Sequence, residues 1–236
     1  FLLNNVATHI IANSSEIKRN IFINNPALVP DRKIQVIYNG IDLTECQVEP
    51  KIPLYHKESS EIILGNAGRL VEQKGQTYLI ELAHALKKDG IRFKLIIAGE
   101  GPLEKDLKEY ASQLNVHDQM VFTGFLTDIK AFMDSIDIFV LTSIHEGSAN
   151  TLLEAMAYEK PVIAFDISSN SEVIQDHSTG FLVEFPSVKK MANRIKQLHK
   201  DELLRNKLGK NGRVWISQKY SFKNSFEKLM KMVEDS

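Results

Sequence analysis

The sequence contains little that would suit a secreted, membrane-spanning or nucleic-acid-binding protein. Its single cysteine, Cys46, cannot close an intrachain disulfide, which excludes a small disulfide-stabilised scaffold and fits a reducing compartment. No run approaches the roughly 18 consecutive apolar residues of a transmembrane helix. The 29 basic and 30 acidic side chains give a net charge of −1, whereas proteins that bind nucleic acids or anionic membranes usually carry a basic excess. We therefore expect a cytoplasmic protein that binds no nucleic acid and meets small molecules or other proteins.

Common motifs for metals, nucleotides and nucleophilic catalysis are absent as well. The seven histidines show neither an HxxxH nor a Cys/His spacing, so we expect no metal site. There is no Walker-type loop, no dinucleotide GxGxxG and no serine in a nucleophile-elbow context. His145 stands beside an acid at the end of an expected strand, but a lone histidine there is more often structural.

With 236 residues the chain is long enough for one large domain, or for one domain and part of another. Apolar residues make up 43% and charged residues 25% of it, an ordinary composition that can bury a sizeable core. It begins with Phe1 rather than Met, directly in an apolar segment, so we interpret it as a piece of a longer polypeptide.

From residue 62 onward, short apolar runs alternate with helical patterns, which is typical of repeated βαβ units. We expect strands at 62–66, 93–98, 121–123, 138–141, 162–165 and 180–183. We expect helices at 76–89, 103–114, 129–136, around 152–156, and at 172–176, 187–199, 202–218 and 221–234. The strands are unbroken apolar runs, so helices should cover both faces of the sheet. This predicts an α/β fold with a doubly wound parallel sheet, in which ligands bind beyond the carboxyl ends of the strands.

The first 60 residues follow a different pattern. We expect a helix–strand–helix passage over 6–12 and 14–22, followed by a strand at 34–38 that ends in a turn at 39–40. Residues 45–60 contain two prolines and little periodicity, and we interpret them as a linker.

Two cations flank a flexible turn after the first expected strand. In the segment Gly68–Gly75, the Arg69 guanidinium and the Lys74 ammonium could hold a diphosphate, the first as a fork and the second as a point charge. The alternative is that both are solvated surface charges, and the position at a strand's carboxyl end leaves the two interpretations about evenly balanced. The next strand is followed by Gly99-Glu100-Gly101, where glycines allow close approach to a ligand but also commonly open helices.

Small residues follow the fourth expected strand and precede a helix. The segment Gly147-Ser148-Ala149-Asn150 leaves backbone amides unpaired, and the helix dipole adds partial positive charge there. We therefore expect an anion site suited to phosphate.

Glu146 and Glu154 bracket this segment, eight residues apart. A paired-carboxylate hydrolase is disfavoured, since eight helical residues rise about 12 Å and glycosidase pairs are ~5–9.5 Å apart, although Glu146 lies in a loop and could bend closer. We favour one extended ligand contacted at two places, because carboxylates are strong acceptors for sugar and ribose hydroxyls.

Six motifs occur in order along the chain. They are V-I-Y-N-G-I-D at 36–42, A-G-R-L-x3-K-G at 67–75, A-G-E-G-P at 98–102, F-T-G-F at 122–125, H-E-G-S-A-N-T-L-L-E-A-M at 145–156 and P-V-I-A at 161–164. In these motifs the chain, from about Val6 to Glu234, resembles the group-1 retaining glycosyltransferases (glycosyltransferase family 4). That family has the GT-B architecture of two facing Rossmann-like domains.

The resemblance implies that the chain is the carboxy-terminal half of such an architecture. Residues 61–215 would be the nucleotide-sugar donor-binding domain, and 45–60 the linker before it. Residues 1–44 would be a remnant of the amino-terminal acceptor domain and the start of the linker, and 216–236 a helix that crosses back toward that domain.

The resemblance also implies a role for individual residues. Arg69, Lys74 and Glu146 would be the catalytic residues, the two cations on the diphosphate and Glu146 on the transferred sugar, with Glu154 on the ribose hydroxyls. The turn at 124–126 would lie by the base. The expected donor-binding residues are Gly68, Glu100, Gly124, Phe125, Leu126, Gly147, Ser148, Ala149, Asn150, Thr151 and Glu154. The family needs neither a metal nor a DxD motif, so we expect no cofactor.

The implied activity is transfer of a sugar from a UDP- or GDP-sugar to a glycan or lipid-linked acceptor, with retention of configuration. A Lys-, Asn- and Ile-rich member suggests bacterial polysaccharide synthesis, which leaves open a place at the cytoplasmic face of the inner membrane. The acceptor would be bound through the missing amino-terminal domain, so we expect this chain to bind a nucleoside diphosphate and to transfer no sugar alone. The alternatives are a GT-B epimerase or phosphorylase, and a non-catalytic nucleotide-sugar-binding or partner-binding module.

Two positions depart from the family pattern. S-S-N-S-E at 168–172 stands where the family often has Gly-Gly-x-Pro-Glu, which bears on how closely that backbone can approach the sugar. Glu159 replaces a glycine before Lys-Pro and should make the end of its helix less favourable.

Overall fold

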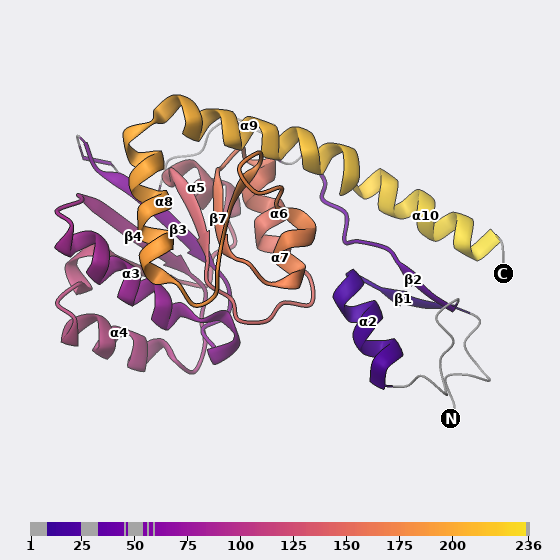
Figure 1. The fold of residues 1–236 in the computed structure, drawn as a ribbon, viewed down its shortest axis with the longest axis horizontal. Helices are drawn as coiled ribbons and strands as arrows, with labels where there is room; N and C mark the ends of the chain where they lie inside the picture. The colour runs from indigo at the N-terminus through magenta and orange to yellow at the C-terminus, as the bar shows by residue number, and fades with distance from the viewer. Residues whose placement is uncertain are drawn as a thin grey trace.

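The largest element of the protein is a six-stranded, fully parallel sheet with the strand order β5-β4-β3-β6-β7-β8. Figure 1 shows this sheet surrounded by helices. The computed structural model describes residues 9–24, 33–44, 46, 54–55, 57–58 and 60–234. The six strands are β3 (Ile62–Ala67), β4 (Phe93–Ala98), β5 (Met120–Gly124), β6 (Ile138–Leu141), β7 (Val162–Phe165) and β8 (Gly180–Val183). The predicted doubly wound parallel sheet is therefore confirmed.

Helices cover both faces of this sheet. The first face carries α3 (Gln76–Lys88), α4 (Glu104–Gln113) and α8 (Val188–Lys200), and the second carries α5 (Ile129–Ser135), α6 (Asn150–Ala157) and α7 (Ser168–Val173). The long helix α9 (Glu202–Lys219) contributes Leu208 to the first core and Ile216 to the second.

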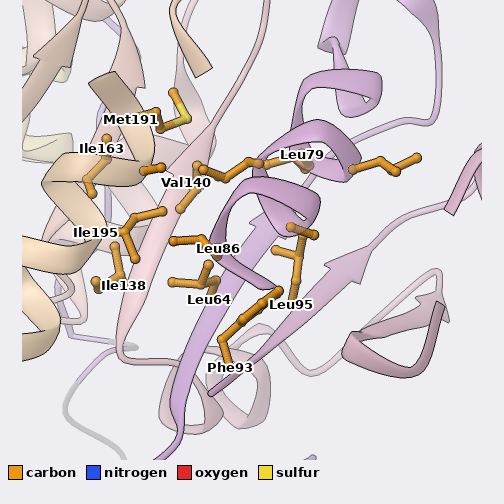
Figure 2. Packing of buried hydrophobic residues seen from close by; sticks show 14 of the residues in the cluster. Leu64, Leu79, Leu86, Phe93, Leu95, Ile138, Val140, Ile163, Met191 and Ile195 are labelled. Carbon is orange, nitrogen blue, oxygen red and sulfur yellow. The ribbon is translucent and has the colours of Figure 1, made fainter. Parts of the chain in front are cut away.

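The pleat of β3 explains why Ile62, Ile63 and Leu64 are all apolar. Ile62 and Leu64 are buried in the core on the first face, whereas Ile63 between them is buried in the core on the second. Leu64 lies opposite Leu95 of β4 and Ile138 of β6 in the strand registers, and Figure 2 shows all three beneath the helices of the first face. Because β3 is one of the two central strands, its carboxyl end lies at the middle of the sheet edge.

One predicted helix lies in the wrong place. We expected a helical turn at 172–176, but α7 spans Ser168–Val173 and the chain is extended again at Ile174. The helix begins early because the Asn170 side chain donates a hydrogen bond to the Phe165 carbonyl, and it ends early because Val173 and Ile174 both turn into the core. The other predicted helices and strands from residue 62 onward match the structure to within a few residues at each end.

The amino-terminal region forms a small separate sheet. Strands β1 (Ile10–Ala12) and β2 (Ile34–Val36) pair in parallel. The helix α2 (Ser15–Asn24) packs against both strands. The segment predicted at 14–22 corresponds to α2 and the strand predicted at 34–38 corresponds to β2, but the segment predicted at 6–12 is wrong over 10–12, where the β-branched residues at 10–11 pair with β2 as the strand β1. Residues 6–8, and most of the predicted linker at 45–60, lie outside the described residues.

Helix α10 (Phe222–Glu234) continues from α9 toward the small sheet (Figure 1). Its first residue donates a backbone hydrogen bond to Ile41, and Ser225 Oγ donates to the Tyr38 carbonyl at 2.8 Å. Among the helices that the structure describes, none is long and apolar enough to cross a membrane.

The amino-terminal helix α2 is capped by a carboxylate from the central domain. Glu172 of α7 accepts hydrogen bonds from the backbone N–H groups of Ser15 at 3.1 Å and Glu16 at 3.2 Å, and Ser14 Oγ accepts from the N–H of Ile17. These amides would otherwise lack acceptors in the first turn, and the negative charge also favours the positive end of the helix.

Replacing this carboxylate should loosen α2. We expect Glu172→Ala to lower the free energy of unfolding by about 1 kcal/mol, because a helix cap is lost. Hydrogen exchange should become faster at the amides of Ser15 and Glu16 in particular. The matched control is Glu227→Ala on α10, where an exposed glutamate has its carboxylate 3.9 Å from Lys223 and its loss should change stability by less than about 0.5 kcal/mol. Unchanged exchange at α2 in Glu172→Ala would show that the cap contributes nothing.

Candidate functional site

The candidate site lies where the direction of winding reverses in the sheet. Strands β3 and β6 are neighbours, but the helix after β3 packs on the first face and the helix after β6 on the second. The loops 68–75 and 142–149 therefore leave the sheet in opposite directions from adjacent strand ends. In open α/β sheets, ligands bind in the crevice that such a reversal creates.

Glycines let the loop after β4 press against the loop after β3. Gly99 has a φ of +133°, and a Cβ built on it would lie 2.0 Å from the Gly68 carbonyl oxygen. A Cβ on Gly101 would lie 2.3 Å from the carbonyl oxygen of Leu70, whose own N–H donates to the Glu100 carbonyl at 2.9 Å. The glycines at 99 and 101 thus serve the close approach of two backbones, which fixes the loop that carries Arg69.

The loop after β3 is joined to the loop after β6 by an ion pair. Lys74 Nζ lies 2.6 Å from Glu146 Oε1, and Ser143 Oγ donates a second hydrogen bond to the same oxygen at 2.6 Å. The side chains of Lys74 and Glu146 are only 22% and 5% exposed, so solvent screens the pair less than a surface pair. The Lys74 ammonium is therefore held in a fixed place and is not a freely solvated surface charge.

Backbone contacts reinforce this junction. Gly75 has a φ of +61°, and a Cβ on it would come within 2.3 Å of the Thr142 carbonyl oxygen. The N–H of Ile144 donates to the Gln73 carbonyl at 2.9 Å. Because any side chain at position 75 would collide with the other loop, the K-G pair in the sequence is a packing requirement as well as a source of charge.

A cavity of about 330 Å³ opens beside these loops. It is lined by Ala67, Gly68, Arg69, Ala98, Gly99, Glu100, Phe125, Leu126, Ile129, Thr151 and Glu154. The structure thus brings Gly68, Arg69, Glu100 and Glu154, all predicted from the sequence, to the wall of one cavity. Arg69 itself is exposed, and no ion pair holds its guanidinium within the described part of the chain.

Other predicted residues lie around the cavity and not in its wall. Lys74 and Glu146 form the ion pair, and Ala149 is buried at the start of α6. Asn150 and Glu154 also line a larger cavity of about 570 Å³ between α6, α10 and the segment 37–41. Glu154 therefore lies between two cavities.

The turn at 124–126 is positioned by Glu100. Gly124 has a φ of +70°, and the N–H of Phe125 donates to Glu100 Oε1 at 3.1 Å. The Phe125 side chain is 71% exposed, so its ring is available at the rim of the cavity. Sequence reasoning placed Glu100 on a ligand, and the structure gives it this contact with the turn.

The carboxylate of Glu154 is partly buried without a hydrogen-bonding partner among the residues that the structure describes. Burial raises the pKa of Glu154, because desolvation disfavours the charged form. An unpaired carboxylate in a cavity wall can accept hydrogen bonds from hydroxyl groups of a ligand.

The first turn of α6 presents free backbone donors. In the described structure the amides of Gly147–Thr151 have no hydrogen-bond acceptor, and Ala149 at the N-cap provides none from its side chain. These N–H groups and the positive end of the helix dipole suit an anion. The anion site expected from the sequence lies at this turn.

Sequence reasoning missed three polar residues at this site. Ser143 orients Glu146, and its signal was a small polar residue directly after an apolar strand. The Asn39 side chain donates to Ser148 Oγ at 3.3 Å and to Asn150 Oδ1 at 2.9 Å, and Glu172 caps α2. Nothing in the sequence indicates these two contacts, because the partners are more than a hundred positions apart.

The two departures from the family pattern have visible consequences. Glu159 has a φ of +56°, a left-handed conformation that favours glycine, so the expected unfavourable helix end is confirmed. Ser169 is buried, and its Oγ has no partner among the described residues. Within the same residues, no three His, Cys, Asp or Glu side chains gather in a way that could hold a metal ion.

Comparison with known proteins gives one family. The model of the family "Glycosyl transferases group 1" matches residues 50–215. The capsular polysaccharide biosynthesis glycosyltransferase CapM of Staphylococcus aureus is 31% identical over 234 residues, which cover 96% of this chain and 61% of CapM. The putative glycosyltransferase EpsD of Bacillus subtilis is 39% identical over 193 residues, which cover 78% of this chain and 50% of EpsD.

A solved structure extends the likeness to the fold. TarM of S. aureus, crystallised as a mutant with fondaparinux, α-GlcNAc-glycerol and UDP, has a TM-score of 0.83 and 28% identity, and the match covers 97% of this chain and 44% of TarM. The chain thus spans about half of the length of the relatives that it matches.

The buried carboxylate leads to a prediction about pH. The raised pKa of Glu154 means that the folded state keeps its proton to a higher pH than the unfolded state, where the pKa has its ordinary value of about 4.5. Below that value both states are protonated and Glu154 costs no stability. As the pH rises through the folded-state pKa, the wild type loses stability. Glu154→Gln should therefore be more stable than the wild type at neutral pH and equal to it at about pH 4.

Thermal unfolding at a series of pH values measures this difference. Glu109→Gln, which changes an exposed glutamate on α4, is the matched control and should run parallel to the wild type. Parallel curves for Glu154→Gln and the wild type would mean that the carboxylate is not destabilised by its cavity.

Proposed function

Because the chain belongs to the group 1 glycosyl transferases, we propose that it binds a nucleotide sugar and supplies the donor side of a retaining sugar transfer. The relatives include enzymes of bacterial polysaccharide synthesis, and the TarM structure holds UDP. We propose a UDP-sugar as the donor, with GDP-sugars as the alternative, and a glycan or lipid-linked acceptor. Residues 61–215 would form the donor domain, 45–60 the linker to it, and 1–44 and 216–236 would belong with the acceptor side.

The observation that carries this proposal is the convergence of positive groups at one edge of the sheet. Arg69 lies in the wall of the cavity, Lys74 is held beside it, and the free amides of Gly147–Thr151 come from the adjacent loop. A diphosphate is a dianion or more at neutral pH, and forked, point-charge and amide donors together suit it. Lys74 would exchange its contact with Glu146 for a phosphate oxygen.

The rest of the donor would extend through the cavity of about 330 Å³. The ribose hydroxyls would donate to Glu154, which would offset the cost of burying that carboxylate without a partner. The base would lie against the exposed ring of Phe125 and the turn at 124–126 that Glu100 positions. The transferred sugar would meet Glu146 and the small residues that follow it.

The chemical step would depend on fixed charges. As the bond from the sugar to the diphosphate breaks, negative charge grows on the leaving phosphate and the sugar gains oxocarbenium character. Arg69, Lys74 and the α6 amides would stabilise that charge in the transition state without needing a group that titrates. The acceptor would then attack from the face that the diphosphate leaves, which retains the configuration.

Removing either cation should weaken binding of the diphosphate. We expect Arg69→Ala and Lys74→Ala to lower the affinity for UDP by about 10- to 100-fold, the loss of a charge-assisted hydrogen bond, and the affinity for UMP by less. Titration calorimetry of the chain with UDP, GDP and UMP measures these affinities. Lys105→Ala, an exposed cation on α4, is the control and should bind like the wild type. Wild-type protein that binds none of these nucleotides would refute the proposed function.

We further propose that the 236 residues bind the donor without transferring sugar, because the acceptor would be held by a part of the longer polypeptide. A measured transferase turnover of this chain alone would contradict this. In the longer protein, Arg69→Ala should lower kcat by about 10²- to 10³-fold, the usual effect of removing one transition-state donor. Full activity of Arg69→Glu there would remove Arg69 from the mechanism.

A further inference from the structure

One side chain of the amino-terminal segment reaches into the loop that would bind the diphosphate and sugar. Asn39 Nδ2 donates to Asn150 Oδ1 at 2.9 Å and to Ser148 Oγ at 3.3 Å. Ser148 Oγ also lies 2.9 Å from Asn150 Oδ1, so the three side chains form a closed triangle. The triangle fixes the start of α6 from outside the central sheet.

Asn39 is itself mounted on rigid structure. The ring of the preceding Tyr38 packs edge-on against buried Tyr220, with centroids 5.1 Å apart, and its carbonyl accepts from Ser225 Oγ. A Cβ on the following Gly40 would lie 2.5 Å from the Cα of Phe222, so the backbone at 40 is pressed against α10. Asn39 can therefore hold the loop in place and is not merely carried along by it.

The loop needs such an external support. Its amides from Gly147 to Thr151 find no acceptor in the described protein, and N-cap residue Ala149 offers no side-chain bond. Because these N–H groups make no internal hydrogen bond, another contact has to fix the backbone if they are to face a bound anion. Donors that are fixed in advance bind an anion more strongly than mobile donors. Ser148 and Asn150 are the side chains of this segment that Asn39 contacts, so they are where this support acts.

We propose that Asn39 is a positioning residue for the donor: through Ser148 and Asn150 it holds the amides of the 147–151 segment where the diphosphate and sugar would lie. The proposal rests on the proposed function. It makes the affinity for the diphosphate depend on a residue of the segment after β2, outside the cavity that binds the nucleoside. Movement of this segment would have to break the triangle, so the segment's position and diphosphate binding would be coupled in both directions.

The test compares UDP with UMP on single and double variants of the chain. Asn39→Ala should weaken UDP binding by about 3- to 10-fold, the effect of one or two hydrogen bonds, and leave UMP binding within about twofold. A merely structural role would lower the affinity for both nucleotides alike. If Asn39 acts through Asn150, the double variant Asn39→Ala/Asn150→Ala should bind UDP no more weakly than Asn150→Ala alone.

Two further variants guard against misleading results. Asn39→Leu keeps a similar volume but cannot donate a hydrogen bond. It should weaken UDP binding as Asn39→Ala does, which separates the lost hydrogen bonds from any effect of the smaller alanine on folding. Asn24→Ala, at the exposed end of α2, is the matched control and should bind like the wild type.

The outcomes separate this proposal from the one it rests on. If the wild type does not bind UDP, the proposed function fails and this inference falls with it. If the wild type binds UDP in a manner that depends on Arg69 but both Asn39 variants bind as the wild type does, the positioning role alone is wrong. Equal loss of UDP and UMP affinity, or additive effects in the double variant, would also overturn it.

Discussion

The arrangement of the site depends on the reversal between β3 and β6. Since these neighbouring strands send their helices to opposite faces, their loops part at the centre of the sheet and cannot fill the space between them. The glycines at 75, 99 and 101 then let the loops approach one another so closely that a methyl group would collide with a carbonyl oxygen. The strand order thus creates the crevice, and the glycines allow the close backbone contacts that hold the surrounding loops in place.

Charge is arranged in the crevice before any ligand arrives. The Lys74 ammonium is paired with Glu146, whose oxygen is also bonded to Ser143, so both side chains are held in one geometry. A partly buried ion pair adds little net stability, because desolvation of the two charges opposes their attraction. The ion pair acts here by fixing geometry, since it keeps a cation beside Gly68 in the cavity wall and joined to Glu146, which directly precedes the segment with the free amides. A phosphate could replace the carboxylate as the partner of Lys74 with little rearrangement.

Much of the fold could be predicted because its signals are local. Largely apolar runs such as β4 and β7 have one interpretation in a chain of βαβ units, and the loops after them follow from the order of elements. The helix expected at 172–176 was misplaced because α7 begins at Ser168, where the Asn170 side chain in its first turn donates back to the Phe165 carbonyl. The contacts of Asn39 with Asn150 and of Glu172 with Ser15 had no local signal, since each joins segments that only the completed fold brings together.

Unsatisfied groups of two complementary kinds lie at this edge of the sheet. The Glu154 carboxylate has no partner among the described residues and has its pKa raised by burial, and the amides at the start of α6 have no acceptor. Buried polar groups are normally hydrogen-bonded, and leaving them unpaired lowers stability. The crevice therefore presents one unpaired acceptor and several unpaired donors. These groups are complementary to a ligand that has hydroxyl groups at one place and negative charge at another. The same groups that lower the stability of the empty protein would therefore supply the affinity and the orientation of the donor.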